Sequence, residues 1–521
     1  MRRPAPWPPA VLGVLAGAVG VVSIASALTP SLANRVELVQ GVLPPGLPEV
    51  ARWLALAFGL ALGSLAGSLG RGKRRAWQLA IVLVAGVAIA HLLKGLDAEE
   101  AGVSIALLVA LIASRKHFDV PGDPDLRPLV LTVLALGSLL GVLVLYELHE
   151  SGLPDDLFNL LTATATLVSF RALYLWLRSR QRDAPTTRDR ARARTLVEEH
   201  GRDTLSYFNL RRDKSYFFSP SRRSFLAYGV VGGVALVSGD PVGTASEFPA
   251  LLRSFRSDAR GRGWRVAILS ASRELLPVYR AVGFHAMKVG DEAVVRPADF
   301  SLEGRPIRKV RQSVSRLRRA GYTVSILEEA DLTPALCAEL HGVSDEWRGS
   351  WPERGFSMAM DGLFGDPGTL FVIARDAKGR VGGFLHLVPS PASGGYSLSA
   401  MRRLRKTPNG LMEFLVVEAL AWTRVKGASE VSLNFCVFAD FLRAGQPSVT
   451  RWVARQSLRS LDRVFQLERL LRFTGKFFPE WRPRFLCVER FSDFPLVGLA
   501  YLRAESLLTP PGPWTRLRRA A

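Results

Sequence analysis

Cysteine is scarce in this chain of 521 residues, which contains only Cys337, Cys436 and Cys487, far apart from one another. An odd number of isolated cysteines provides neither a disulfide framework nor the Cys-x-x-Cys pairs typical of zinc sites. This pattern is typical of domains that fold in a reducing compartment, so we expect the soluble part of the chain to be cytoplasmic.

Acidic residues are also few, 46 against 68 lysines and arginines, which leaves a formal net charge of +22 and a pI near 10.7. A coding bias toward arginine would account for part of this excess. The remainder indicates polyanionic partners, and nucleic acid and an anionic lipid surface are the two physical candidates.

Long apolar runs are almost absent after residue 178 and abundant before it. Residues 1–177 therefore predict a membrane domain, because each run is close to the ~20 residues that cross a bilayer. The first run is too long for a signal peptide and more runs follow it, so we interpret it as an anchor. About six transmembrane helices are expected, near residues 7–28, 51–70, 76–95, 99–114, 128–148 and 157–177.

Lysine and arginine gather in alternate loops of this region, notably at 71–75 and 114–117. The positive-inside rule then predicts a multi-pass protein of the plasma membrane with both termini, and everything after Arg178, in the cytoplasm. Residues 178–202 are expected to form a basic juxtamembrane linker, with seven arginines and two aspartates in 178–194. Such a run either lies on anionic headgroups or is a solvated tether.

The rest of the chain alternates strand-like and helix-like patterns, which is typical of an α/β fold. Residues 203–302 and 323–521 repeat a similar order, in which a strand, a basic turn and a helix follow one another. This order is the one used by N-acyltransferases. We therefore expect a multi-pass helical membrane region followed by two tandem N-acyltransferase-like (GNAT-like) domains. The second domain includes expected strands at 369–376, 381–389, 394–400 and 430–435 and a helix at 410–426.

A cationic helix is expected between these domains, at 303–322. Val310, Val314 and Leu317 share one apolar face, while basic residues and no acid occupy positions 305–319. Three interpretations stay open: a solvated helix face, a helix lying on a membrane surface, and a helix that grips a nucleic-acid backbone. Only the last predicts a steep salt dependence of nucleic-acid binding.

Eight short segments of the cytosolic part, in collinear order, together resemble the aminoacyl-phosphatidylglycerol synthases. This family is also called the multiple-peptide-resistance factors or phosphatidylglycerol lysyltransferases, and the chain resembles its short form. The segments are DTLSYFNLRRDKSYFFS (203–219), VGGVALVSGDPVG (231–243), RRAGYTV (318–324), ERGFSMAM (353–360), SLSAMRR (397–403), PNGLMEFLVVEAL (408–420), VSLNF (431–435) and LLRFTGKFFPEWRPRFL (470–486).

The resemblance implies transfer of an amino acid from aminoacyl-tRNA to the glycerol hydroxyl of phosphatidylglycerol. Lysine is the first expectation for the donor, with alanine and arginine as alternatives. The reaction exchanges one ester for another and needs no cofactor or metal. It would lower the negative charge of the membrane and give resistance to cationic peptides. What the protein must supply is a cationic surface, access to lipid, and a base and positive charge near one carbonyl.

The catalytic residues expected from this pattern are Arg402, Arg403, Asn409 and Glu413. The two arginines precede a Pro-Asn-Gly turn that opens a helix, where free N–H groups attract a phosphate or an oxyanion. Glu413 is one turn into the helix, as a proton acceptor or an amino-group ligand; it is otherwise an ordinary first-turn acid. Family members usually have Asp where this chain has Ser399.

A second group, at 468–485, mixes cations with aromatic residues and is assigned to the lipid through the family resemblance: Lys476, Trp481, Arg482 and Arg484. For tRNA the expected ligands lie on the cationic helix: Arg308, Lys309, Arg311, Arg316, Arg318 and Arg319. Two other functions stay open. One is a membrane-anchored N-acyltransferase that uses acyl-CoA, for which RKTPNGLMEF is a partial match to a phosphate loop. The other is a non-catalytic membrane protein that binds RNA or lipid.

Overall fold

The computed structural model describes residues 7–28, 47–95, 97–120, 184–349, 351, 355–437 and 467–506. The chain divides into two compact units. One is formed by residues 1–181 together with 258–264, and the other by residues 182–257 and 265–521. We call them the helical unit and the α/β unit.

The helical unit contains α1 (Trp7–Leu28), α3 (Leu47–Leu69), α4 (Arg74–Gly95) and α5 (Ala98–Ala113). The first three are long and apolar enough to cross a membrane, and they match the first three expected spans. The fourth expected span is the 16-residue helix α5. Spans 128–148 and 157–177 lie outside the described residues, so the six-helix topology stays a prediction. Glycines allow α1 and α3 to approach closely, since a Cβ at Gly20 would lie 2.7 Å from the Gly59 carbonyl oxygen.

The α/β unit begins earlier than the sequence indicates. Thr186 and Asp189 form a reciprocal capping box that starts α8 (Thr187–His200), and Leu196 and Val197 on this helix are buried in one cluster with Phe208. Residues 187–200 of the expected linker 178–202 therefore form a helix with one apolar side packed against the protein. Residues 178–183 lie outside the described residues, and the expected role of the basic segment beside the membrane stays a prediction.

The other elements follow in the order of the chain. The first half has β1 (Ser215–Phe218), β2 (Ser224–Val231), β3 (Val234–Ser238), β4 (Val242–Gly243), α9 (Phe248–Gly261), β5 (Arg265–Ala271), α10 (Leu276–Ala281) and β6 (His285–Val295). The second half has α11 (Arg308–Arg319), β7 (Thr323–Glu328), α12 (Pro334–Arg348), β8 (Leu370–Arg375), β9 (Val381–Ser390), β10 (Gly395–Arg403), α13 (Leu411–Val425), β11 (Val431–Val437), α16 (Leu467–Thr474), β12 (Glu480–Val488) and α17 (Phe494–Ala504).

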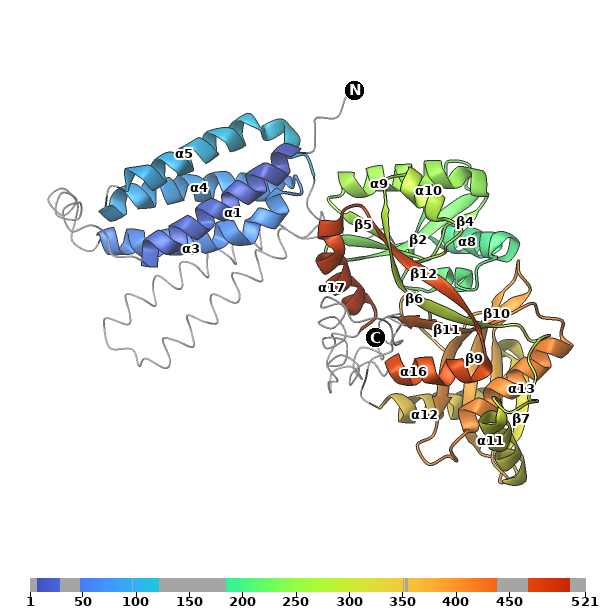
Figure 1. Ribbon diagram of the computed structural model, residues 1–521. Helices are drawn as coiled ribbons and strands as arrows, with labels where there is room; N and C mark the ends of the chain where they lie inside the picture. The colour runs from blue at the N-terminus through green and yellow to red at the C-terminus, as the bar shows by residue number, and fades with distance from the viewer. Residues whose placement is uncertain are drawn as a thin grey trace, which may run out of the picture. The chain divides into compact units, whose positions relative to one another are not determined.

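One sheet passes through both halves, in the order β1-β2-β3-β5-β12-β6-β11-β10-β9-β8-β7 (Figure 1). Each half contains one parallel pair, β3 with β5 and β10 with β11. The strand β12, from the C-terminal part of the chain, lies between β5 and β6 and is antiparallel to both. Val488 and Val497 join Leu236 and Leu269 in one buried cluster. Residues 480–504 thus complete the first half, whereas the expected limit 323–521 assigns them to the second.

The second half has its own core around α13. Leu411, Phe414 and Leu415 of α13 are buried between the sheet and the apolar face of α11, whose Val310, Val314 and Leu317 belong to the same cluster. The cationic helix therefore exists as expected, but its apolar face is used inside the protein. A membrane-surface helix needs that face for lipid, so this interpretation is excluded for α11.

Candidate active site

The parallel strands β10 and β11 separate after a short region of pairing. Tyr396 pairs with Val431 and Ser397 with Ser432, whereas β10 continues to Arg403 and β11 to Val437. Both strands carry an irregularity where they part, between Leu398 and Ala400 in β10 and between Ser432 and Phe435 in β11. A bulge bends a strand and redirects a side chain. Beyond Ser397 and Ser432 the two strands no longer pair with each other, so their facing residues can contact other groups.

Ser399 and Asn434 are the residues at these two irregularities, and a third segment joins them. The Ser399 hydroxyl accepts a hydrogen bond from the Met360 amide at 3.0 Å. Asn434 has φ of 79°, and its side-chain amide donates to the carbonyl oxygens of Met358 at 2.7 Å and Leu398 at 3.0 Å. A positive φ is uncommon outside glycine, and asparagine tolerates it best. Three of the segments that carry the family resemblance thus meet at one point.

The Pro-Asn-Gly turn before α13 packs against the cationic helix. Gly410 has φ of 95°, and a Cβ there would lie 2.6 Å from the Cβ of Ser313 on α11, so only glycine fits. The Asn409 carbonyl accepts a hydrogen bond from the Arg316 guanidinium at 2.5 Å. No side chain caps the first turn of α13, and its backbone N–H groups and Arg316 together give this corner a positive potential.

Glu413 and Lys476 form an ion pair at 2.7 Å. The Lys476 ammonium also lies 5.5 Å from the ring centroid of Phe473 on α16. The expected catalytic acid and one expected lipid ligand are therefore partners, although 63 positions separate them in the chain. On the next turn Glu418 accepts a hydrogen bond from Arg318 of α11 at 2.7 Å. Two acids on different sides of α13 are thus each paired with a cation from another element.

Arg402 and Arg403 lie on opposite faces of the sheet. Strand β10 includes both residues, and successive side chains of a strand alternate. Arg403 lies opposite Gly383, where a Cβ would touch both Arg403 and Met412 of α13. Arg402 faces the other layer, where its charge and, above all, burial lower the pKa of His386 to about 3. The two arginines and the start of α13 therefore do not act on one anion, and this corrects the expected catalytic group.

Arg484 is buried, and its guanidinium is occupied by two carboxylates. It donates to both oxygens of Asp203, at 2.6 and 3.0 Å, and to Glu292 at 2.5 and 2.9 Å. The carboxylates raise the pKa of Arg484 against the opposing effect of burial. A guanidinium held in this way has no donor directed at solvent, so the expected contact with lipid phosphate is replaced by an internal one.

The same network continues to the strands that separate. The Thr204 and Ser432 hydroxyls both donate to Glu292 at 2.5 Å, and the Ser397 hydroxyl donates to the Thr204 carbonyl at 2.5 Å. Thr204, Ser397 and Ser432 lie in segments that carry the family resemblance, but the sequence did not identify them as site residues. Ser397 and Ser432 carried a signal, because each is a small polar residue inside an otherwise apolar strand, which predicts buried hydrogen bonds.

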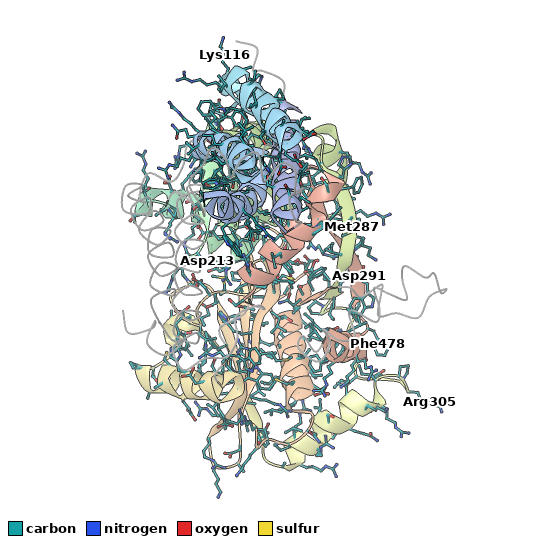
Figure 2. The ribbon with its side chains drawn as sticks, turned by 90° about the vertical axis from the view of Figure 1, so that its left-hand side faces the viewer. Lys116, Asp213, Met287, Asp291, Arg305 and Phe478 are labelled. Carbon is teal, nitrogen blue, oxygen red and sulfur yellow. The ribbon has the colours of Figure 1, made fainter. Side chains whose placement is uncertain are left out.

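The other expected ligands lie nearer the surface. Arg482 is paired with Glu430 at 2.7 Å and with Glu480 at 3.2 Å, and Trp481 packs partly buried against the core of the second half. Beside them Phe478 is 61% exposed and lies at the periphery of the α/β unit (Figure 2). On α11, Arg311 is half-buried and donates to the Gly304 carbonyl at 3.1 Å. The remaining expected tRNA ligands are exposed: Arg308, Lys309, Arg316, Arg318 and Arg319.

Comparison with known proteins gives a consistent result. The model of the family described as "Phosphatidylglycerol lysyltransferase, C-terminal" matches residues 194–488. The lysylphosphatidylglycerol biosynthesis bifunctional protein LysX of Mycolicibacterium gilvum is 32% identical over 97% of this chain and 50% of its own length. The LysX protein of Rhodococcus jostii is 34% identical over 88% of this chain and 45% of its own length. The chain thus spans about half of the length of these relatives.

Solved structures extend the match to three dimensions. The C-terminal domain of a putative lysylphosphatidylglycerol synthetase from Agrobacterium fabrum is 28% identical, with a TM-score of 0.52, over 60% of this chain and 95% of that one. L-PGS from Bacillus licheniformis, at 24% identity, shares the fold with a TM-score of 0.55 over 63% of this chain and 99% of that one. With the family model covering more than half of its residues, the chain belongs to the phosphatidylglycerol lysyltransferase family.

Proposed function

We propose that the α/β unit transfers an aminoacyl group, with lysine as the first candidate, from aminoacyl-tRNA to the glycerol hydroxyl of phosphatidylglycerol. The observation that carries this proposal is the similarity of 97% of the chain to proteins named for lysylphosphatidylglycerol biosynthesis. The parallel pairs β3–β5 and β10–β11, each joined by a helix, support two tandem N-acyltransferase-like halves. Of these two parallel pairs, only β10 and β11 separate after a short region of pairing. We therefore assign catalysis to the second half.

The chemistry is an ester exchange. The lipid hydroxyl attacks the aminoacyl carbonyl and loses its proton, a new ester bond forms, and the ribose hydroxyl of tRNA leaves with a proton. Glu413 is the proton carrier of this scheme, and Lys476 keeps it in position through the 2.7 Å ion pair. The N–H groups at the start of α13, with Arg316 and Arg403 on the same side, supply positive potential for the developing oxyanion. No step calls for a metal or a cofactor.

In this scheme the tRNA and the lipid approach the start of α13 from different sides. The tRNA backbone is bound by the exposed cations of α11, whose apolar face is already buried. The lipid headgroup is bound by Lys476 and Arg482, with Trp481 and the exposed Phe478 beside the acyl chains. Anchoring by the apolar N-terminal helices, in a multi-pass topology with a cytoplasmic α/β unit, keeps the enzyme at its lipid. The product carries added positive charge, which lowers membrane anionic charge and weakens the attraction of cationic peptides.

Expression in a bacterium that lacks aminoacylated lipids tests this function. Thin-layer chromatography of the lipid extract, developed with ninhydrin, should reveal a new amino-positive phospholipid that migrates with lysylphosphatidylglycerol. A new spot with alanine or arginine would change the donor and retain the reaction. An unchanged lipid profile, with the protein present in the membrane fraction, would favour a non-catalytic lipid- or RNA-binding role.

A further inference from the structure

Basic side chains just before β1 donate hydrogen bonds to the backbone of a distant segment. Residues 355–364, which we call the strap, lead from the end of α12 toward β8. The Lys214 ammonium donates to the Phe356 carbonyl at 2.6 Å, and the Arg211 guanidinium donates to the Ala359 carbonyl. Arg212 donates to the Phe364 carbonyl at 3.1 Å. Three basic side chains within four positions thus donate to three carbonyl groups of one segment, 142, 148 and 152 positions away.

Lys214 and Arg211 make these contacts inside the protein, where both side chains are buried. Lys214 is fully buried, and its ammonium lies 3.4 Å from the centroid of the Phe356 ring. Arg211 is held in place by Asp213, through hydrogen bonds of 3.0 and 2.8 Å to the two carboxylate oxygens; Asp213 is labelled in Figure 2. Burial raises the pKa of the Glu505 carboxyl, and the charges of Arg211 and Lys214 and the backbone N–H groups of Phe356 and Ser357 oppose that rise. Burying a lysine is costly unless it is hydrogen-bonded or paired, and the Phe356 carbonyl and ring provide partners for the buried Lys214.

The opposite edge of the strap forms part of the candidate active site. The Met358 carbonyl accepts from Asn434, and the Met360 amide donates to Ser399. Carbonyls 356 and 359 thus bind the first half, whereas carbonyl 358 and amide 360 bind the two strands that separate in the second half. The strap therefore transmits the position of the 211–214 row to Ser399 and Asn434.

We propose that Lys214 and Arg211 are positioning residues of the acyl-transfer site, which act through the strap by fixing the Met358 carbonyl and Met360 amide against Asn434 and Ser399. They touch no reacting atom in this scheme. A displaced strap would let the ends of β10 and β11 change their separation, and transfer is sensitive to misplacement of about 1 Å. The kinetic part of this inference rests on the proposed aminoacyl transfer, whereas the structural part does not.

The test uses the full-length chain in detergent and the substitution Lys214→Met, which retains side-chain length and removes the ammonium. Hydrogen exchange followed by mass spectrometry should show faster exchange in peptides that cover 355–364, with β7–β8 unchanged. Product formation should fall about tenfold or more in kcat, with little change in KM for aminoacyl-tRNA. Lys378→Met, in the exposed β8–β9 turn, is the matched control for lost charge.

A second substitution leaves the charges intact. A Cβ at Gly229 of β2 would lie 2.8 Å from the Phe356 ring, so Gly229→Ala should displace the strap by contact alone and give the same pattern of exchange and kcat. This keeps the proposal testable if Lys214→Met does not fold. Strap exchange equal to wild type in both variants would overturn the positioning role. A loosened strap with unchanged kcat would do so as well. If wild type makes no aminoacyl lipid, the proposed function fails while the exchange experiment still decides whether Lys214 holds the strap.

Discussion

Lys476 reaches back from the segment after α16 to pair with Glu413 on the first turn of α13, with 2.7 Å between Nζ and Oε1. The side chain of Glu413 is 16% exposed and that of Lys476 is 42% exposed. An ion pair whose lysine is this exposed contributes at most about 1 kcal/mol to folding, so the proposed role of the pair in the reaction can be tested without unfolding the protein.

Neutralising either partner should therefore reduce activity far more than stability. We expect Glu413→Gln and Lys476→Met each to lower aminoacyl-lipid formation about tenfold to a hundredfold, with a change of less than about 1 kcal/mol in unfolding free energy. The double variant should lose little more than the worse single variant, because the two residues act as a unit. Strictly additive losses in a double-mutant cycle would show that the pair is incidental.

The cationic face of α11 should govern tRNA affinity. Reversing Arg308, Lys309 and Arg319 to Glu should weaken aminoacyl-tRNA binding and lower the slope of log K against log salt by about one unit for each lost phosphate contact. Filter binding between low and moderate salt measures both quantities. Arg311 and Arg316 are unsuitable for this test because their hydrogen bonds to the Gly304 and Asn409 carbonyls are structural. Arg253→Glu, at an exposed position of α9 in the first half, controls for a charge reversal elsewhere, and an unchanged slope in the triple variant would leave α11 as a solvated face.

Substitutions of Arg482 and Arg484 should have different effects, the first on lipid binding and the second on folding. Replacing Arg484 with Met leaves Asp203 and Glu292 buried without their cation, which should cost roughly 3–5 kcal/mol and reduce the use of both substrates. Arg482→Ala, at a surface pair, should spare folding and tRNA affinity while lipid use falls about tenfold. Denaturation followed by tryptophan fluorescence, with both substrate titrations, distinguishes the two. A fully stable Arg484→Met protein with a selective lipid defect would return Arg484 to the lipid site.

Acid should destabilise the α/β unit through His386. Burial and the nearby Arg402 lower the pKa of this histidine from 6.5 to about 3. Below pH 6.5 His386 is therefore protonated in the unfolded chain but stays neutral in the folded chain. The contribution of His386 to the free energy of unfolding is fully present above pH 6.5 and falls as the pH drops toward 3. The loss attributable to His386 at pH 5 is about 2 kcal/mol.

The substitution His386→Phe should remove this part of the pH dependence. Phe fits the site, because the imidazole stacks on the Phe371 ring with 4.7 Å between centroids. Unfolding measured at pH 7.5 and pH 5 should show a smaller difference for the variant than for wild type. His200→Gln, at the exposed end of α8, is the control. Equal differences in wild type and His386→Phe would mean that His386 takes up its proton while folded.

Local patterns predicted the elements of the second half well. The helix expected at 410–426 is α13 at Leu411–Val425, and the strand expected at 381–389 is β9 at Val381–Ser390. The apolar spacing of Val310, Val314 and Leu317 identified the buried face of α11. Such features depend on residues three or four positions apart, or on alternation along a strand, which a sequence displays directly.

The arrangement of the site depended on contacts that no local pattern carries. Arg484 sits in an aromatic and basic segment typical of a lipid site, and only the passage of β12 between β5 and β6 turns it toward Asp203 and Glu292. The expected strand at 394–400 stopped short of Arg402. Because β10 continues to Arg403, alternation sends the two arginines to opposite faces. The strap forms hydrogen bonds with residues 211–214, Ser399 and Asn434, which come from three separate parts of the chain.

The most direct test of aminoacyl transfer combines the purified full-length protein in detergent, phosphatidylglycerol, and lysyl-tRNA carrying radioactive lysine. We predict that label moves into the chloroform-soluble lipid at a rate that depends on both substrates and is lost when the tRNA is digested with ribonuclease first. Chelators and the absence of acyl-CoA should leave this rate unchanged. No labelled lipid under these conditions, together with acylation of an amine that requires acyl-CoA, would contradict the account and identify an N-acyltransferase.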